Sequence, residues 1–202
     1  MRHFTPILYF ILLLFNTISC AKNSELNRSE NYPIRTYAKF QGLPDWCEYE
    51  WPVNQHHPPP RLNLPDWACE VVASRKLDEK YTPSVHLNPF FLLGDFDGDH
   101  RTDIAILIKN KESGESGILM IHRKNSKTFI LGAGNLIEER GGSNFDWIDM
   151  WTIYPKGKID RSPYEDHTPI LRGDALWVAK SESASLIIFW NGEKYSWYRE
   201  TD

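Results

Sequence analysis

The sequence predicts a mainly β fold of the α+β kind, an antiparallel β-domain with a short N-terminal helical layer. Aromatic residues are abundant, with 8 Trp, 9 Tyr and 10 Phe in 202 residues, and such side chains favour strands and supply core volume. From residue 90 onward, short branched and aromatic runs alternate with Gly, Asn and Asp. Because no clear helical pattern separates these runs, we expect neighbouring strands to pair antiparallel.

Near the start of the chain, Arg2 precedes an apolar run over residues 7–15. This pattern is typical of an export signal, and the run is too short to span a membrane. The Thr-Ile-Ser-Cys sequence at 17–20 resembles the lipobox of bacterial lipoproteins. This resemblance implies a signal peptide over residues 1–19 and a lipid such as palmitate on Cys20. It also implies attachment to the bacterial cell envelope, at the outer membrane or the periplasmic face. Thr17 stands where the family usually has an aliphatic residue, so an ordinary cleaved signal peptide and an uncleaved signal anchor remain alternatives.

Residues 20–40 are predicted to be a lipid anchor and flexible tether, because they are polar and show no apolar period. The remainder, 41–202, is predicted to form a single globular domain that begins with short helices and a linker over 41–85. Two Leu-Pro-Asp-Trp segments, at 43–46 and 64–67, indicate helix starts. Pro loses no hydrogen bond in a first helical turn, and the acid meets the positive end of the helix.

Two cysteines remain besides Cys20, and both lie near the predicted helix starts. In an oxidising compartment such cysteines commonly pair, so we predict a disulfide between Cys47 and Cys69. The alternative is two buried free thiols. A zinc site is not indicated, because no further Cys pair or suitably spaced His pair accompanies them.

Eight strands are predicted in the β-rich part of the chain, residues 86–202. The last two are the clearest, because they flank Asn191-Gly192, the strongest signal for a two-residue hairpin turn. The predicted strands cover residues 89–94, 103–109, 117–123, 127–131, 150–155, 175–180, 184–190 and 194–199.

The most informative motif lies between the first two of these strands. Asp95, Asp97, Asp99 and Asp103 place four carboxylates within nine residues. Ca²⁺ prefers about six to eight oxygen ligands, and an Asp-rich turn can supply many of them. Without a cation, carboxylates crowded in this way repel one another. We therefore predict Ca²⁺ as a cofactor, the alternative being an ordinary hairpin whose Asp residues only cap the turn.

Residues 90–123 resemble an FG-GAP or VCBS-type repeat, whose loop provides side-chain ligands at positions one, three, five and nine and a carbonyl at position seven. The resemblance implies a blade-like calcium-loop hairpin and a site that by itself defines no activity. Position six of such loops is usually Gly, because the backbone turns left-handed there. This chain has His100, a residue type that tolerates that conformation better than most. The implied metal ligands are Asp95, Asp97, Asp99, Arg101 through its backbone oxygen, and Asp103.

No catalytic residues are predicted. Acids spaced like Asp146 and Asp149 are common in solvated loops. Their spacing in the sequence does not establish the distance between two carboxylates that a glycoside hydrolase needs. Residues 141–149 are expected to form a surface loop. Trp147 and Trp151 offer flat apolar faces with one hydrogen-bond donor each, so we predict a candidate ligand surface made of these four residues. Packing of the Trp side chains in the core is the alternative.

The net charge of −4 argues against nucleic acid as a partner, because phosphate binding requires a basic surface. The motifs together predict a non-catalytic, calcium-stabilised binding or scaffolding module, anchored to the membrane by the lipid on Cys20, whose partner is an envelope protein or glycan. An envelope hydrolase using loop carboxylates and a purely structural lipoprotein remain alternatives. An exposed aromatic patch would distinguish the binding module from the structural one, and a pocket with convergent acids would indicate the hydrolase.

Overall fold

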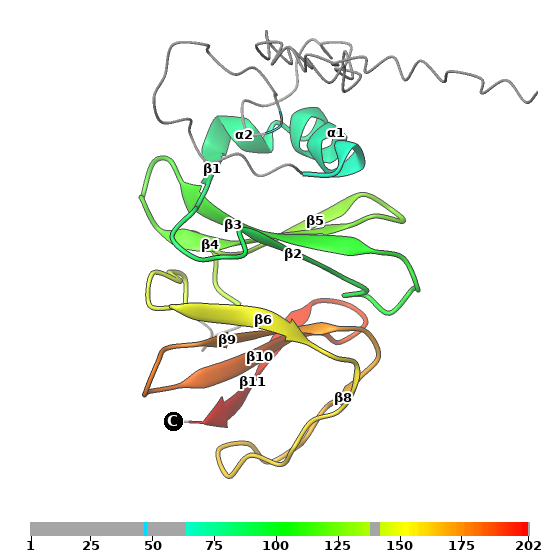
Figure 1. Cartoon of the computed structure of the whole chain (residues 1–202), viewed down its shortest axis with the longest axis vertical. Helices are drawn as coiled ribbons and strands as arrows, with labels where there is room; N and C mark the ends of the chain where they lie inside the picture. The colour runs from blue at the N-terminus through cyan, green and yellow to red at the C-terminus, as the bar shows by residue number, and fades with distance from the viewer. Residues whose placement is uncertain (1–46, 48–63, 138–141, 202) are drawn as a thin grey trace, which may run out of the picture. The chain divides into compact units, whose positions relative to one another are not determined.

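The structure, a computed structural model, describes Cys47, residues 64–137 and residues 142–201. All of them belong to the unit Lys39–Asp202. The predicted signal peptide, Cys20, the tether and the helix start at 43–46 lie outside the described residues. Two helices and antiparallel strands make up the described part (Figure 1), which confirms the prediction of a mainly β protein. Among the described helices, none has the length and apolarity needed to cross a bilayer.

The two helices lie next to each other in the chain, as α1 (Asp66–Ser74) and α2 (Leu77–Lys80). α1 begins directly after Pro65, whose carbonyl accepts the N–H of Ala68 at 2.9 Å, so the Pro-Asp signature marked this start correctly. The buried face of α1 includes Cys69, which forms the predicted disulfide with Cys47 at a Cα–Cα distance of 5.8 Å.

The first sheet has the strand order β1-β3-β4-β5, with β2 also paired with β3. Pro83 of β1 lies opposite Ile108, and Phe91 of β2 lies opposite Ile106, so the two short strands follow each other along one edge of β3. The strands are β1 (Tyr81–Pro83), β2 (Phe91–Gly94), β3 (Asp103–Asn110), β4 (Ser116–His122) and β5 (Lys127–Gly132).

The second sheet has the order β11-β10-β9-β6, and β7 pairs with β8 in a separate ribbon. Asn191-Gly192 lies in the turn between β10 and β11, as predicted. All eight predicted strands are present, whereas β1, β7 and β8 were missed because two or three residues are too few to show a period. The remaining strands are β6 (Met150–Tyr154), β7 (Gly157–Lys158), β8 (Ile170–Leu171), β9 (Ala175–Ala179), β10 (Ser185–Trp190) and β11 (Tyr195–Thr201).

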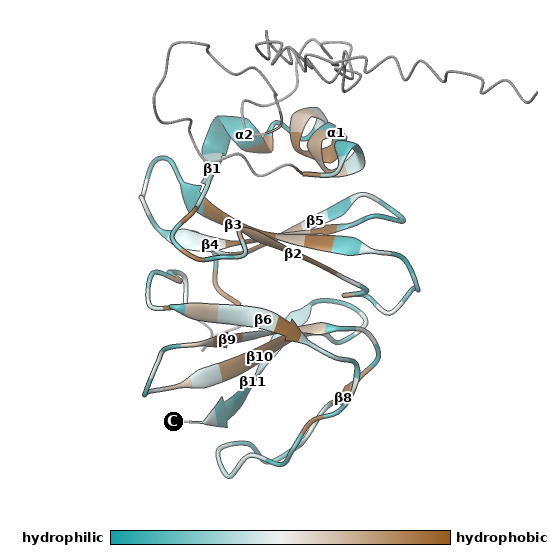
Figure 2. Cartoon of the chain, in the orientation of Figure 1, coloured by the Kyte–Doolittle hydropathy of each residue, from teal (hydrophilic) through white to brown (hydrophobic). Residues whose placement is uncertain are grey.

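Alternation along the strands separates the buried side chains into layers. Ile104 and Ile106 of β3 pack with α1, whereas Ala105 and Leu107 of the same strand face the second sheet. The outer face of the second sheet, which includes Ile187, packs with residues of the β7–β8 ribbon. Figure 2 shows the hydrophobic residues gathered on the strands and on α1, while the connections are mostly hydrophilic. Phe96, in the loop that joins β2 to β3, belongs to the core between the two sheets.

Replacing both cysteines, as Cys47→Ala with Cys69→Ala, should lower the free energy of unfolding by about 2–4 kcal/mol, because the cross-link restricts the unfolded chain. Urea denaturation of the full chain measures the loss. Wild-type protein treated with a reductant is the matched control and should unfold at the midpoint of the double variant. A double variant as stable as the oxidised wild type would contradict the structural role of this disulfide.

Candidate metal centre

The loop between β2 and β3, residues 95–102, is attached to the second sheet by main-chain contacts. The N–H of Asp95 donates to Asp174 Oδ2 at 2.9 Å, and the N–H of Asp174 donates to the Asp95 carbonyl at 2.7 Å. Asp174 immediately precedes β9. Phe96 is fully buried and packs into the core between the sheets. The acidic loop is therefore a junction between the two sheets rather than a free hairpin end.

The carboxylate of Asp103, at the start of β3, holds this loop closed. Its Oδ2 accepts the N–H groups of Phe96 at 3.0 Å and Asp97 at 3.2 Å, and its Oδ1 accepts the N–H of Arg123 at 2.9 Å. Burial raises the pKa of Asp103 to about 6, while the hydrogen bond from Arg123 opposes the shift and the charge of Asp97 adds to it. Three main-chain N–H groups thus donate hydrogen bonds to the buried carboxylate of Asp103.

Asp95, Asp97 and Asp99 point oxygens at one another, with one oxygen from each lying within 4.8 Å of the others. Local turns set this arrangement, because Asp97 Oδ1 accepts the N–H of Asp99 at 3.1 Å and Asp99 Oδ1 accepts the N–H of Arg101 at 2.9 Å. The second oxygen, Asp99 Oδ2, is shielded from solvent and accepts no hydrogen bond from the described residues. The ammonium of Lys124 lies 3.5 Å from it.

His100 adopts the left-handed backbone conformation that the loop requires, with φ at +68°. Its N–H donates to Asp95 Oδ1 at 3.1 Å, and its side chain is 82% exposed, with Nδ1 of the ring 3.8 Å from Asp95 Oδ2. Gly98 is also left-handed, and a Cβ there would lie 2.8 Å from the Arg172 carbonyl. The loop therefore tolerates His at position six but needs Gly at position four, where it approaches the second sheet.

His122, which the sequence did not indicate, joins the site from β4. Its Nδ1 lies 3.3 Å from Asp97 Oδ2, and its Nε2 lies 2.8 Å from the Tyr195 hydroxyl on β11. Burial lowers the pKa of His122, against the opposing effect of Asp97, and burial raises the pKa of Tyr195. When Nδ1 carries a proton, it can donate to Asp97, and in the neutral ring Nε2 can then accept the hydroxyl proton of Tyr195.

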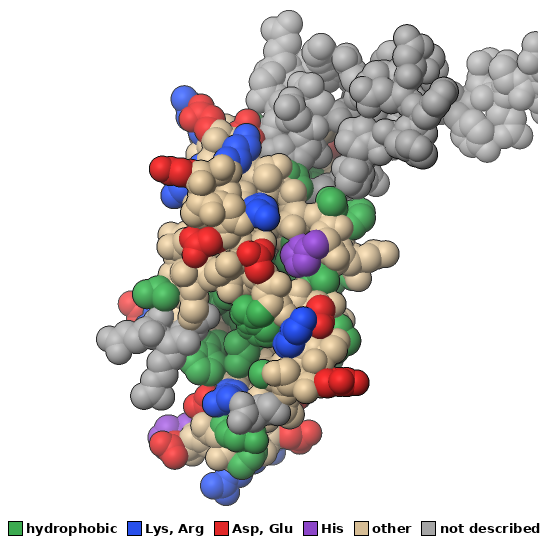
Figure 3. Space-filling model, turned by 90° about the vertical axis from the view of Figure 1, so that its left-hand side faces the viewer, with side chains coloured by type: hydrophobic (Ala, Val, Ile, Leu, Met, Phe, Trp, Pro, Cys, Tyr) green, Lys and Arg blue, Asp and Glu red, His purple; other side chains and the backbone are tan. Residues whose placement is uncertain are grey.

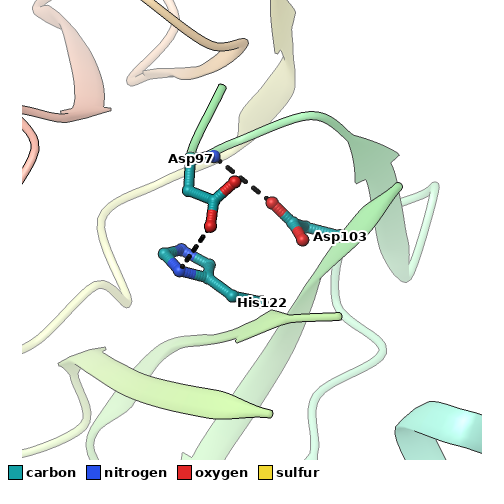
Figure 4. Close-up of side chains that lie close together, drawn as sticks. All are labelled: Asp97, Asp103 and His122. Atoms are coloured by element: carbon teal, nitrogen blue, oxygen red, sulfur yellow. Dashed lines mark hydrogen bonds and ion pairs between the residues drawn. The ribbon is translucent and has the colours of Figure 1, made fainter. Parts of the chain in front are cut away.

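One signal could have placed His122 in this site. In a strand, side chains two positions apart share a face, and Ile118 and Met120 lie on the β4 face that packs against the second sheet. His122 is the next residue of that series. Figure 4 shows its ring pointing toward Asp97, with Asp103 close to both. The sequence does not indicate which loop contacts the end of this β4 face.

The structure brings the four predicted carboxylates together around Asp97. This residue belongs to two groups of potential ligands, one with Asp95 and Asp99 and the other with Asp103 and His122. A carboxylate has about four lone-pair positions, and three on Asp103 are taken by N–H groups, so it keeps about one for a cation. Oxygen ligands of this kind suit a hard cation such as Ca²⁺ or Mg²⁺.

The four residues of the predicted ligand surface are not all exposed. Trp151 is only 5% exposed, and its indole N–H donates to the Pro89 carbonyl at 2.7 Å. The prediction that Trp151 contributes to a surface is therefore wrong, because the alternation of β6 turns this side chain into the core between the sheets. Trp147 is half-buried and lines an open cleft.

The two acids of that predicted surface are held by hydrogen bonds. Asp146 accepts bonds from the hydroxyl of Ser116 and the amide of Asn144, and these lower its pKa. The N–H of Ser181 donates to Asp149 and is the main cause of its lowered pKa. Both acids are thus kept ionised, whereas an acid–base pair needs pKa values that are pushed apart. This pair does not support the hydrolase alternative.

The cleft beside Trp147 has a volume of about 580 Å³. Figure 3 shows one face of the molecule, turned by 90° from the view of Figure 1. On this face, hydrophobic side chains gather with basic and acidic side chains around them (Figure 3). The lining residues are Trp147, Tyr164, Glu165, Lys180, Ser183, Ala184, Leu186, Trp197 and Arg199.

Comparisons of the chain with protein-family models, with curated proteins and with solved structures found no match. The resemblance of residues 90–123 to an FG-GAP repeat stays a prediction, and so do the lipobox and the calcium ligands. The geometry of the loop and the cleft is what supports a function.

Replacing His122 by Leu should lower the free energy of unfolding by about 1–3 kcal/mol, because the buried hydroxyl of Tyr195 then has no acceptor. Tyr195→Phe should also destabilise the protein. The double variant should be more stable than the sum of the two losses implies, since it removes both partners. Thermal unfolding of the four proteins measures this coupling, and strictly additive losses would contradict the bridge between the sheets.

Proposed function

We propose that the protein is a calcium-stabilised, non-catalytic binding module of the bacterial cell envelope, anchored by a lipid on Cys20. The observation that carries the calcium part is Asp99 Oδ2, which is shielded from solvent and accepts no hydrogen bond from the described residues. A shielded anionic oxygen without a hydrogen bond is costly. A cation held by Asp95, Asp97 and Asp99 would supply the missing partner. The ammonium of Lys124 is a weaker substitute, because it lies at 3.5 Å and belongs to a half-exposed side chain.

The ligands of the proposed ion follow the FG-GAP pattern. The side chains of Asp95, Asp97, Asp99 and Asp103 and the backbone oxygen of Arg101 would hold it. Bound calcium supplies positive charge that offsets the repulsion among the carboxylates. The left-handed backbone of His100 supports this assignment, because position six of such loops has that conformation.

The strand arrangement supports the blade-like part of the proposal. β2, β3, β4 and β5 follow one another as an antiparallel meander, and the loop lies between the first two strands. The second sheet repeats this pattern with β6, β9, β10 and β11, and Gly173-Asp174 precedes β9. A calcium ion in the first loop would stabilise more than one hairpin, because that loop also contacts Asp174.

A role in binding is favoured over a purely structural role by the open cleft. Two Trp residues and Tyr164 line it, and Tyr164 is exposed. Exposed aromatic side chains gathered in a concave surface are typical of ligand and protein recognition. Export to the envelope is supported by the disulfide, since such bonds persist in oxidising compartments.

Calcium titration of the full chain should show saturable binding and a raised melting temperature. With the dissociation constant of about 10⁻⁴–10⁻³ M that is typical of extracellular modules, about 10 mM calcium should stabilise the fold by about 1.4–2.7 kcal/mol. Isothermal calorimetry and thermal melting measure the two effects. The double variant Asp97→Ala, Asp99→Ala should lose both.

The matched control is the double variant Glu112→Ala, Asp166→Ala, which removes the same charge from two exposed sites outside the loop. It should retain calcium binding. Equal losses in both double variants would mean that calcium only screens general surface charge. No saturable binding by the wild type at millimolar calcium would refute the proposed centre.

The anchor is tested by expressing the full chain and its Cys20→Ser variant in a bacterium. The wild type should partition with membranes, and mass spectrometry should find acyl chains on an N-terminal Cys20. The variant should lack both the acyl chains and the cleavage before residue 20. Wild-type protein cut elsewhere and free of lipid would instead support an ordinary signal peptide.

A further inference from the structure

The cleft beside Trp147 lies at an incompletely covered part of the inner face of the second sheet. In the pairing of β10 with β11, Leu186 lies opposite Arg199 and Ile188 lies opposite Trp197. Ile188 is fully buried in the core between the sheets, whereas Leu186 and Trp197 pack only partly against that core. The same sheet face thus passes from a buried region into the cleft.

The wall of this cleft combines aromatic side chains with charged side chains that contact neighbouring residues. The guanidinium of Arg199 lies 4.9 Å from the ring centre of Tyr164, and the main-chain N–H of Arg199 donates to Glu165 Oε1 at 3.3 Å. The ammonium of Lys180 lies 3.2 Å from Asp149 Oδ2. Hydrogen-bond donors and an acceptor therefore surround the aromatic side chains at fixed positions.

We propose that this cleft binds a saccharide. A sugar ring has an apolar face that can lie against Trp or Tyr, and hydroxyl groups around its edge that both donate and accept hydrogen bonds. The cleft offers both features, with Glu165 as acceptor and Arg199, Lys180 and Ser183 as donors. In addition, Trp197 lines the cleft, and its indole N–H is shielded and has no acceptor among the described residues.

Two other classes of ligand fit less well. An extended peptide would add to the edge of β11, but Glu165 already occupies the N–H of Arg199 beside the cleft. Nucleic acid would need a basic surface to neutralise its phosphates, and the chain has a net charge of −4. The saccharide assignment rests on the proposed binding role and does not depend on the calcium loop.

The test uses the full chain in a detergent without a sugar headgroup. Three trisaccharides serve as probes, one of neutral glucose, one of N-acetylglucosamine and one of galacturonic acid, which distinguish neutral, acetamido and acidic sugars. Calorimetry with tryptophan fluorescence should show saturable binding of at least one. Tyr164→Ala should weaken that binding by about tenfold or more without lowering the unfolding midpoint, because Tyr164 is 47% exposed.

The matched control is Ile170→Ala, which truncates a side chain that is 74% exposed on β8 and does not line the cleft. It should bind as the wild type does. Failure of all three probes at millimolar concentration overturns the saccharide assignment, and binding that Tyr164→Ala leaves unchanged overturns its location. The variant Asp97→Ala, Asp99→Ala should lose calcium binding and keep saccharide binding. In the wild type, saccharide binding without calcium binding refutes only the calcium centre, and calcium binding without saccharide binding refutes only the cleft.

Discussion

The buried carboxylate of Asp103 is the interaction on which the arrangement of this protein depends. It accepts N–H groups from Phe96 and Asp97 in the acidic loop and from Arg123 after β4. A buried acid is tolerated only when donors replace the lost water, and here the main chain provides them. With the loop held in this way, Phe96 reaches the core between the sheets and Asp95 meets Asp174. One side chain thus links the local turn to the packing of the two sheets.

The same packing determines the electrostatics of the loop. Asp97 faces the ring of His122 on one side and lies beside Asp95 and Asp99 on the other. His122 in turn reaches Tyr195 on the second sheet. Charge in the loop is therefore coupled to contacts between the sheets. A cation bound there would act on the stability of the whole β-unit and not only on an exposed turn.

β11 connects the loop region with the cleft. Tyr195, at its start, is buried beneath His122, whereas Trp197 and Arg199, two and four positions further on the same face, line the cleft. The residues between them, such as Tyr198, point to the opposite face. A rigid strand of this kind holds the cleft side chains in fixed positions, which favours binding because less conformational freedom is lost.

The sequence by itself determined the features that depend on neighbouring residues. Alternation indicated eight strands, Asn191-Gly192 indicated the last hairpin, and the Pro-Asp signature indicated the start of α1. The resemblance of the Asp-rich loop to an FG-GAP repeat also implied a left-handed turn at His100. These signals act over a few residues, so a single segment carries each of them.

Only the tertiary structure decided which surfaces meet. It brought His122, Tyr195 and Asp174 to the acidic loop from three other segments, buried Trp151, and left Trp147 and Trp197 at the cleft. Trp147 and Trp151 look alike in the sequence because each follows an acid closely, Trp147 directly after Asp146 and Trp151 two positions after Asp149. Their different burial depends on how one sheet covers another, and contacts between distant segments leave no local pattern in the chain.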